Sequence, residues 1–343
     1  MAKKLINVAV LLGDPRLPDP VKNNGKFNPE DIAVVDRLKE TLKEMQGYNF
    51  TYLDDHEKMF NELERMQNSV EYAFNLCDEG LYNDPAREAD VPIMLEELGI
   101  KHTGAGAECM RLCYNKNRVR SVAKRNGVPV ALGRIIEKDI EPWVSGMVEF
   151  PSIVKPAKGD GSFGINQKSI ARNLSELIEA KNVLRNELGY TGEILVEEFL
   201  DGDEITLGII GNKDKFKTLP PIKEDYSSLP EGLPRICGFE AKWDPSSPYW
   251  SALKSIPADL ERKTREQIER GSIKMFKALG CQDYARFDWR LNSRGEPKLL
   301  EGNPNCGWCH DGHLGKMCNL AGITYGTMLE MILKSAEERI GIY

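Results

Sequence analysis

The segment that most constrains the fold is a pair of alternating runs near the end of the chain. Residues 284–292 read YARFDWRLN, residues 296–304 read EPKLLEGNP, and Ser293-Arg294-Gly295 separates them. Alternation with period two is typical of β-strands, and a short turn containing glycine joins neighbouring antiparallel strands. The sequence therefore predicts a β-hairpin with one polar face, Arg286, Asp288 and Arg290, and one apolar face, Phe287, Trp289 and Leu291.

The polar face of this hairpin carries the residue types that bind magnesium. Glu301 and Asn303 share one face of the return strand, so strand pairing brings both beside Asp288. Two carboxylates and an amide oxygen are hard ligands that suit one or two Mg²⁺ ions holding a nucleotide's phosphates. Arg286 on the same face can clamp an anion. The alternative interpretation is a solvated hairpin face with a cross-strand charge pair.

A glycine-rich segment, PSIVKPAKGDGSFGI, follows an earlier apolar strand. Residues 159–164 match G-x-G-x-x-G, but a dinucleotide fingerprint needs a helix to open at the third glycine, and here the pattern predicts another strand, residues 165–170. A glycine-rich hairpin folding over phosphates fits better, with backbone N–H groups and the Ser162 hydroxyl as donors and Lys155 as counter-charge. An ordinary glycine-rich turn is the alternative.

A third segment, ILVEEFLDGDE at residues 194–204, is an apolar strand that runs into acidic residues and a tight turn. A purine nucleotide could use the backbone groups of residues 198–200 for its adenine and a carboxylate such as Glu204 for its ribose hydroxyls. Taken by itself, the pattern equally describes an ordinary strand exit.

Three domains are predicted from the order of strand and helix patterns. Strands at 5–12, 48–54 and 70–78 alternate with helices at 30–45 and 87–99, which indicates a parallel α/β domain over residues 1–108. The later patterns indicate two α+β domains, residues 109–200 and 201–343. Their elements are helices at 115–127, 173–189 and 258–280 and strands at 150–156, 194–200 and 203–211.

Composition excludes several function classes. The 343 residues carry a net charge of −7 with acidic and basic residues interspersed, so no basic stripe indicates a nucleic acid or an anionic membrane as partner. No apolar run approaches the ~18 residues of a membrane span. The N-terminal MAKKLINVAVLLGDP ends its short apolar run at Gly-Asp-Pro, which favours a buried strand over a secretory signal. Eight scattered cysteines favour reduced thiols, and we expect a cytoplasmic protein.

The order and spacing of these pieces resemble the ATP-grasp superfamily, and specifically the D-alanine:D-alanine ligase group. The resemblance rests on KNRVRSVAKRNGVPV, PSIVKPAKGDGSFG, ILVEEFLDGDEITLGIIG, EAKW, the hairpin and AGITYGTMLEMIL. It implies three domains, with ATP held between the central and C-terminal ones. It also implies that Mg²⁺-ATP, or Mn²⁺ in place of Mg²⁺, phosphorylates a carboxylate and that an amine then attacks the acyl phosphate. Family members are commonly homodimers.

The resemblance also implies roles for individual residues of this chain. Arg286 would steady the acyl phosphate, Ser162 would lie in the flexible phosphate loop, and Lys242 of EAKW would bind phosphate. The implied Mg²⁺ ligands are Asp288, Glu301 and Asn303. The remaining implied ATP contacts are the phosphate lysines Lys116 and Lys155, the adenine hinge Glu197, Glu198, Phe199 and Leu200, and the ribose ligand Glu204.

The chain departs from the D-alanine ligase pattern at the amino-acid sites. LLGDPRLPDPVKNNG lacks the glutamate and histidine that follow the family's first strand, Gly161 replaces the loop's first serine, and Trp243 replaces a tyrosine. Gly312 aligns approximately with the serine that holds the second substrate's carboxylate. We therefore expect small carboxylate and amine substrates, amino acids among them, other than two D-alanines.

Residues 306–310 spell C-x-x-C-H, a haem-attachment signature, and Cys306, Cys309, His310 and His313 are four potential zinc ligands. The absence of an export signal argues against haem, and eight contiguous residues would strain a tetrahedral zinc site. We favour a loop that lines the acceptor pocket, with Trp308, His310, Asp311 and His313 as candidates for substrate contact. Packing or solvent exposure of these side chains is the alternative.

Three functions remain open from sequence. The leading hypothesis is a ligase that forms an amide or peptide bond from a carboxylate and an amine. A related ATP-grasp enzyme with a non-amino-acid acceptor is the second. The third is a nucleotide-binding protein whose substrate pockets have decayed, and Arg286 argues against it because ATP binding alone does not require this residue.

Overall fold

In the computed structural model, which describes residues 5–20, 22–136 and 148–342, the N-terminal sheet is parallel with strand order β2-β1-β3. Its helices cover both faces: α1 and the C-terminal helix α11 pack on one, and α2 and α3 pack on the other. This doubly covered arrangement explains why β1 and β3 are apolar along most of their length. The bounds are β1 Ile6–Leu11, α1 Pro29–Lys43, β2 Tyr48–Leu53, α2 Met59–Met66, β3 Tyr72–Asn75, α3 Asp90–Glu97 and α11 Tyr325–Ile340.

The four-stranded sheet is antiparallel with order β4-β7-β5-β6. Helix α6 covers one face, and the opposite face carries Ile153, Lys155 and Glu197 toward a cavity. Asn173 caps the N-terminus of α6, as its sequence predicts, and Gly189 ends the segment with a positive φ of 63°. The bounds are β4 Gly133–Ile136, β5 Ser152–Pro156, β6 Ile170–Ala171, α6 Leu174–Asn182 and β7 Ile194–Glu198.

The six-stranded sheet follows the order β11-β10-β8-β12-β13, with β9 paired to β8. One face packs against α9, α4 and α5 through Phe287, Trp289 and their neighbours, and the polar residues of β12 lie on the other. The strand bounds are β8 Glu204–Ile210, β9 Lys217–Thr218, β10 Ile222–Asp225, β11 Lys254–Pro257, β12 Tyr284–Leu291 and β13 Pro297–Asn303. The helix bounds are α4 Ala107–Cys113, α5 Lys116–Arg125, α7 Phe239–Trp243, α8 Pro248–Ala252, α9 Arg262–Leu279 and α10 His313–Leu320.

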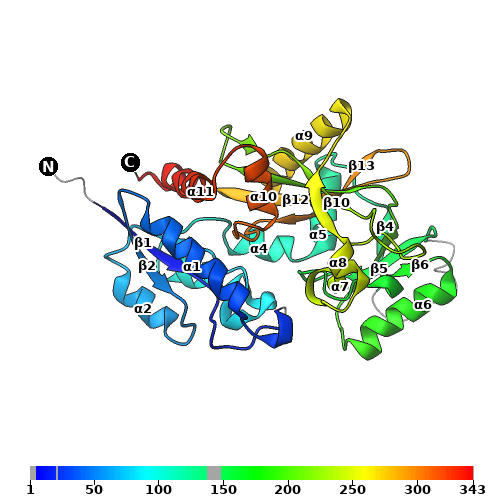
Figure 1. Ribbon diagram of the computed structural model, residues 1–343, viewed down its shortest axis with the longest axis horizontal. Coiled ribbons are helices and arrows are strands. Elements are labelled where there is room, and N and C mark those ends of the chain that lie inside the picture. The colour runs from blue at the N-terminus through cyan, green and yellow to red at the C-terminus, as the bar shows by residue number, and fades with distance from the viewer. Residues whose placement is uncertain (1–4, 21, 137–147, 343) are drawn as a thin grey trace.

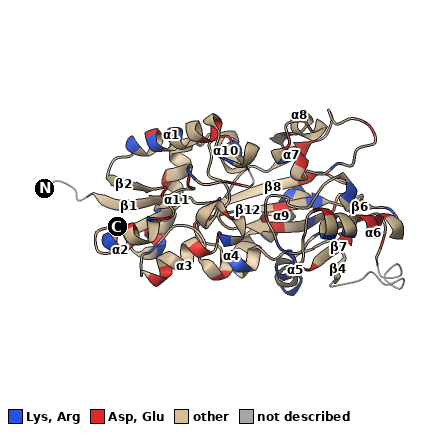
Figure 2. Cartoon of the chain, turned by 90° about the horizontal axis from the view of Figure 1, so that it is seen from below, with Lys and Arg blue, Asp and Glu red and all other residues tan. Residues whose placement is uncertain are grey.

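The N-terminal and four-stranded sheets lie at opposite ends of the long axis, with the six-stranded sheet between them (Figure 1). Both basic and acidic residues are spread along the length of the molecule, as the composition predicts, although α5 carries basic charges alone and α3 acidic charges alone (Figure 2). No helix in the described part of the chain is long and apolar enough to cross a membrane. The fold is the predicted combination of a parallel α/β unit with antiparallel α+β units.

Some elements differ from the sequence prediction. No helix or strand is predicted from sequence in the proline- and serine-rich stretch 220–257. The structure has β10, β11, α7 and α8 there. Residues 165–170, predicted as a strand, form a 3₁₀ turn over Gln167–Ser169 before the two-residue strand β6. Helices α4 and α5 share a core with the six-stranded sheet, although α5 precedes the four-stranded sheet in the chain.

Candidate active site

The β12–β13 hairpin places Asp288 directly opposite Glu301 and Arg286 opposite Asn303. The register then shifts, because Trp289 pairs with Leu299 and leaves Leu300 without a residue opposite it. Strict alternation would send Leu300 and Glu301 to opposite faces, but this irregularity lets both line the same cavity. The hairpin itself was predicted from its alternation; the extra residue was not.

Asp288 is the most heavily contacted member of this group. Its carboxylate accepts hydrogen bonds from Arg286 Nη2 at 3.0 Å, Thr206 Oγ1 at 2.8 Å and Asn303 Nδ2 at 2.9 Å. Burial acts to raise the pKa of Asp288, but the charges of Arg286 and His313 and the hydrogen bond from Thr206 outweigh burial and lower it. Asp288 is therefore ionised at neutral pH, as its predicted role as an oxygen ligand requires.

The cavity in front of this hairpin lies between the four-stranded and six-stranded sheets and holds about 90 Å³. Every residue that the sequence analysis associates with ATP binding or catalysis lines it, together with two of the three predicted metal ligands. These residues are Lys116, Lys155, Ser162, Glu197, Glu198, Phe199, Leu200, Glu204, Lys242, Arg286, Asp288 and Glu301. Asn303, the third predicted ligand, lines the adjoining cavity.

Lys155 is buried at the centre of the cavity wall. Its Nζ lies 2.5 Å from Glu197 Oε2, and Arg120 contacts the other oxygen of this carboxylate. Burial, and then the nearby positive charge of Lys116, lower the pKa of Lys155 to about 7. Glu197, predicted as part of an adenine hinge, thus contacts two basic side chains with its carboxylate.

Lys116 joins the glycine-rich loop to the hairpin. Its Nζ donates a hydrogen bond to Gly159 O at 2.6 Å and lies 3.7 Å from Glu301 Oε2. Lys116 is the first residue of α5. Asn115 caps this helix, because its side chain accepts a hydrogen bond from Arg118 N–H, and the cap fixes where α5 begins. The lysine therefore stands where the phosphate loop and the predicted metal ligands meet.

The glycine-rich loop is fastened to α7. Trp243 Nε1 donates to Gly161 O at 3.2 Å, Ser162 Oγ donates to Cys237 O at 3.1 Å, and Phe239 N–H donates to Ile165 O at 2.8 Å. Ser162 has a φ of +63°, a conformation that favours glycine and is costly for serine. Three hydrogen bonds thus hold the loop beside the cavity, and one of them comes from Trp243, which the sequence analysis identifies as a departure from the family pattern.

The predicted adenine hinge has most of its backbone already bonded. Glu198 N–H donates to Leu132 O at 2.8 Å and Phe199 N–H to Pro151 O at 2.9 Å. In the described part of the chain no hydrogen bond uses Leu200 N–H, which leaves this donor for a ligand. Beyond the hinge, Glu204 accepts from Arg290 Nη1 at 3.0 Å and Tyr226 Oη at 3.2 Å, and burial raises its pKa.

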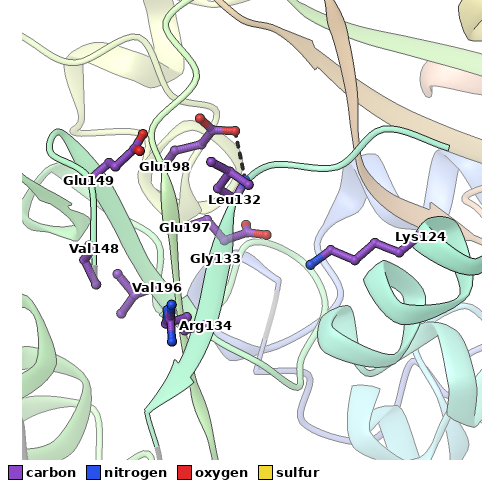
Figure 3. Close-up of a pocket in the computed structure, with 9 residues that line it drawn as sticks. All are labelled: Lys124, Leu132, Gly133, Arg134, Val148, Glu149, Val196, Glu197 and Glu198. Carbon is purple, nitrogen blue, oxygen red and sulfur yellow. Dashed lines mark hydrogen bonds between the residues drawn. The ribbon is translucent and has the colours of Figure 1, made fainter. Parts of the chain in front are cut away.

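A separate hollow of about 470 Å³ runs along β4 at the edge of the four-stranded sheet (Figure 3). Lys124 of α5 points into it, and Glu198 Oε1 accepts the Leu132 N–H beside it. It shares only Glu197 and Glu198 with the cavity described above, and it contains none of the predicted phosphate or metal residues. The predicted chemistry is therefore not located in this hollow.

A larger cavity of about 970 Å³ adjoins the 90 Å³ cavity in front of the hairpin. The two cavities share Glu224, Cys237, Lys242, Arg286 and His313. Sequence reasoning missed most of the other charged residues of the larger cavity, because they come from loops and edges far apart in the chain. The acidic ones are Asp78, Glu79, Glu88, Asp160 and Asp311, and the basic ones are Lys22, Lys254 and Lys316.

Two polar atoms in this cavity are buried without a partner among the described residues. Arg286 Nε is one, and Glu79 Oε2 is the other, although Glu79 Oε1 lies 3.2 Å from Lys22 Nζ. Burial, and then the adjacent Glu79 charge, raise the pKa of Asp78 well above its usual range. An unpaired guanidinium N–H attracts an anion, and an unpaired carboxylate oxygen attracts a cation.

The cysteine and histidine side chains of residues 306–313 do not come together as a metal site. Trp308 is buried in the core, where Nε1 donates to Leu76 O at 2.7 Å, and Cys306 packs in the same core. The ring of His310 lies against Tyr325 outside both cavities. Within the described residues no group of three or more His, Cys, Asp or Glu side chains is placed to hold a metal ion. Only Asp311 and His313 of the four candidates for substrate contact line a cavity.

The chain is similar to known proteins over most of its length. Residues 132–334 match the family described as D-ala D-ala ligase C-terminus. The chain is 27% identical to the vancomycin/teicoplanin A-type resistance protein VanA of Enterococcus faecium over 78% of this chain and 73% of that protein. It is 26% identical to the D-alanine–D-alanine ligase of Bartonella tribocorum over 89% and 90%.

A solved structure shares the fold. The D-alanine–D-alanine ligase from Bacillus anthracis, complexed with ATP, superposes with a TM-score of 0.72 at 21% identity, covering 98% of this chain and 99% of that one. The matched family region contains the hairpin, the glycine-rich loop and both cavities' shared residues. The chain therefore belongs to the D-alanine–D-alanine ligase family.

Proposed function

We propose that this protein is a Mg²⁺-ATP-dependent ligase that joins a carboxylate to an amine through an acyl phosphate, with amino-acid substrates other than two D-alanines. The observation that carries the proposal is one cavity in which Lys116, Lys155, Lys242 and Arg286 face Asp288 and Glu301. Phosphoryl transfer is mainly positioning and charge neutralisation, and this set supplies cations for phosphate oxygens and oxygen ligands for the metal.

ATP would lie with its adenine at the hinge, where Leu200 N–H is available as a donor, and with its ribose near Glu204. Lys116 and Lys155 would hold the phosphates under the glycine-rich loop. Because the cavity holds only about 90 Å³, below the ~300 Å³ or more of typical ligand pockets, the four-stranded sheet or its side chains would move aside to admit the nucleotide.

The donor set fits magnesium rather than a softer metal. Asp288, Glu301 and Asn303 offer oxygen atoms, and no thiol or imidazole is needed. Asn303 donates its Nδ2 to Asp288, so its own Oδ1 is turned away from that carboxylate and is available for coordination. When bound, the metal would neutralise phosphate charge during transfer.

Arg286 would bind the acyl phosphate that forms where the two cavities meet. Its Nη2 is tied to Asp288, while its buried Nε is free of partners among the described residues. A carboxylate substrate activated at this point would have its new phosphate beside this N–H. The glycine-rich loop, which is hydrogen-bonded to Trp243, would exclude water, because water would otherwise hydrolyse the intermediate.

The larger cavity would hold the two organic substrates. Its acidic residues, with the unpaired Glu79 Oε2, suit an ammonium group, and Lys254 and Lys316 suit a carboxylate. Amino acids carry both groups. The size of this cavity argues against the alternative of a nucleotide-binding protein with decayed substrate pockets, since about 970 Å³ remains beside Arg286.

The test is ATP turnover with pooled D- and L-amino acids and Mg²⁺. A ligase releases ADP faster when its substrates are present, whereas a nucleotide-binding protein binds ATP without stimulated release. ADP release that is stimulated by non-amino-acid amines in the presence of a carboxylate would favour an ATP-grasp enzyme with a non-amino-acid acceptor.

A further inference from the structure

His313 stands where the two cavities meet. It is the first residue of α10, and it is among the five residues that line both cavities. Imidazole exchanges protons near neutral pH more readily than the guanidinium, ammonium or thiol groups beside it. A side chain at this point can reach a substrate that attacks from the larger cavity.

The contacts of His313 assign the tautomer of its ring. Nδ1 lies 3.4 Å from Arg286 Nη1, and Nε2 lies 3.2 Å from Glu224 Oε1. A guanidinium has only N–H donors, so Nδ1 accepts with its lone pair. Nε2 then carries the proton and donates it to Glu224. The basic nitrogen therefore faces Arg286 and the site of acyl phosphate formation.

Glu224 on β10 holds this arrangement in place. The carboxylate is buried, and its two oxygens lie 3.1 Å and 3.3 Å from Ser255 Oγ, so they share the single O–H that this hydroxyl donates. Burial acts to raise the pKa of Glu224, but the hydrogen bond and charge of His313, and then Ser255 and Lys316, lower it. An ionised carboxylate behind an imidazole orients the ring and stabilises the imidazolium that forms when the ring takes a proton.

We propose that His313 Nδ1 is the general base of the second half-reaction and that Glu224 is its positioning residue; this rests on the ligase function proposed above. The amine substrate arrives as an ammonium, which has no lone pair to attack with. One of its protons passes to His313 Nδ1, the freed lone pair forms the C–N bond, and the C–O bond to phosphate breaks. A second proton leaves with the phosphate, and the imidazolium returns its proton to solvent.

The charged groups around His313 are consistent with this role. Arg286 and Asp288 face it from β12, Glu224 from β10, Lys242 from α7 and Lys316 from its own helix. The two carboxylates stabilise the imidazolium that forms when the ring takes a proton. When Arg286 turns to the acyl phosphate, its bond to Nδ1 is released and the lone pair becomes available.

The test compares two nucleophiles in the full-length His313→Gln variant. Hydroxylamine is neutral near pH 7 and traps an acyl phosphate as a hydroxamate without needing a base, whereas an amino acid must lose a proton. With pooled amino acids, Mg²⁺ and ATP, we expect amide formation in His313→Gln to fall by roughly 100-fold or more while hydroxamate formation is unchanged. His310→Gln, three residues before His313 and outside both cavities, is the matched control.

The outcomes separate this inference from the proposed function. Equal amide formation in His313→Gln and wild type overturns the base assignment and leaves the ligase intact. Parallel loss of hydroxamate and amide assigns His313 to substrate or phosphate binding and overturns the base role. Absence of both products in the wild type overturns the ligase function and this inference with it.

A second readout does not depend on turnover. The chain has four histidines, so the ¹⁵N signals of His313 can be assigned by their loss in His313→Gln. We expect the Nε2–H tautomer in wild type and a change of tautomer population in Glu224→Gln, whose pH profile for amide formation should also shift. An Nδ1–H tautomer in wild type, or a Glu224→Gln spectrum unchanged at His313, contradicts the proposal.

Discussion

Asp288 and Glu301 are direct cross-strand partners, and the strand register shifts at the next position along β12. Their carboxylates face the cavity from neighbouring strands, with Lys116 Nζ 3.7 Å from Glu301 Oε2. This pair is the core of the proposed magnesium site. Its geometry depends on a strand irregularity as much as on the identity of the two residues.

Replacing Glu301 by glutamine should abolish turnover and leave the fold intact. The change removes one anionic oxygen ligand but keeps side-chain size, and the side chain is only partly buried. We expect kcat to fall by roughly 100-fold or more and Mg²⁺ affinity to fall with it, measured by ADP release and by calorimetric titration. Glu296→Gln at the exposed turn of the same hairpin is the control. Near wild-type turnover in Glu301→Gln would contradict the metal assignment.

ATP binding should take up protons above pH 7. Because the pKa of Lys155 is lowered to about 7, its amine is mostly neutral at pH 8 in the free protein. Phosphate oxygens favour the ammonium and raise this pKa, so binding draws a proton from solvent, and affinity increases as pH falls toward 7. Calorimetry of ATP binding in buffers of different ionisation enthalpy measures the uptake. Lys155→Met should remove it, and uptake that persists in this variant would place the proton on another group.

Trp243→Phe should loosen the glycine-rich loop. The variant keeps an aromatic ring but loses the hydrogen bond to Gly161 O, a contact worth about 1 kcal/mol. We expect faster amide hydrogen exchange over residues 159–164 and more ATP hydrolysis without amide formation, because water reaches the intermediate. Trp250→Phe on the exposed surface of α8 serves as control. Unchanged exchange in the loop would show that other contacts hold it.

Trp308→Ala should cost stability rather than substrate affinity. The indole is 3% exposed, packs in the core and donates to Leu76 O. Loss of this packing typically costs about 3–5 kcal/mol, whereas His310→Ala on the surface should stay within about 0.5 kcal/mol of wild type. Urea unfolding gives these free energies, and KM values come from ADP release in conditions where the variant is folded. A raised KM with unchanged stability would contradict this prediction and indicate that Trp308 contacts the substrate.

Local patterns predicted the parts of the site that lie on one strand or one loop. The alternation of β12 puts Arg286, Asp288 and Arg290 on one face, and the glycine-rich segment marks the loop that Trp243 holds. Those local patterns do not determine which strands pair in a sheet. Thr206 reaches Asp288 because β8 pairs with β12, a partnership between segments about 80 residues apart.

Glu224 illustrates what sequence could not reveal. It lies in a proline- and serine-rich stretch where strand β10 is only four residues long and lacks an apolar run. Its function as the partner of His313 arises when β10 pairs with β8 and α10 packs over the same sheet. Ile222 is the one apolar residue of β10, so the sequence of this strand has no period-two pattern to distinguish it from a loop.

The central claim is that a carboxylate is activated by phosphorylation and then joined to an amine. The most direct measurement uses pooled amino acids labelled with ¹⁸O in their carboxylates, with Mg²⁺ and ATP, and mass spectrometry of the phosphate and the organic products. We expect phosphate that carries one heavy oxygen and a product whose mass equals two substrates less one water. Unlabelled phosphate, or ADP without a coupled product, would contradict it.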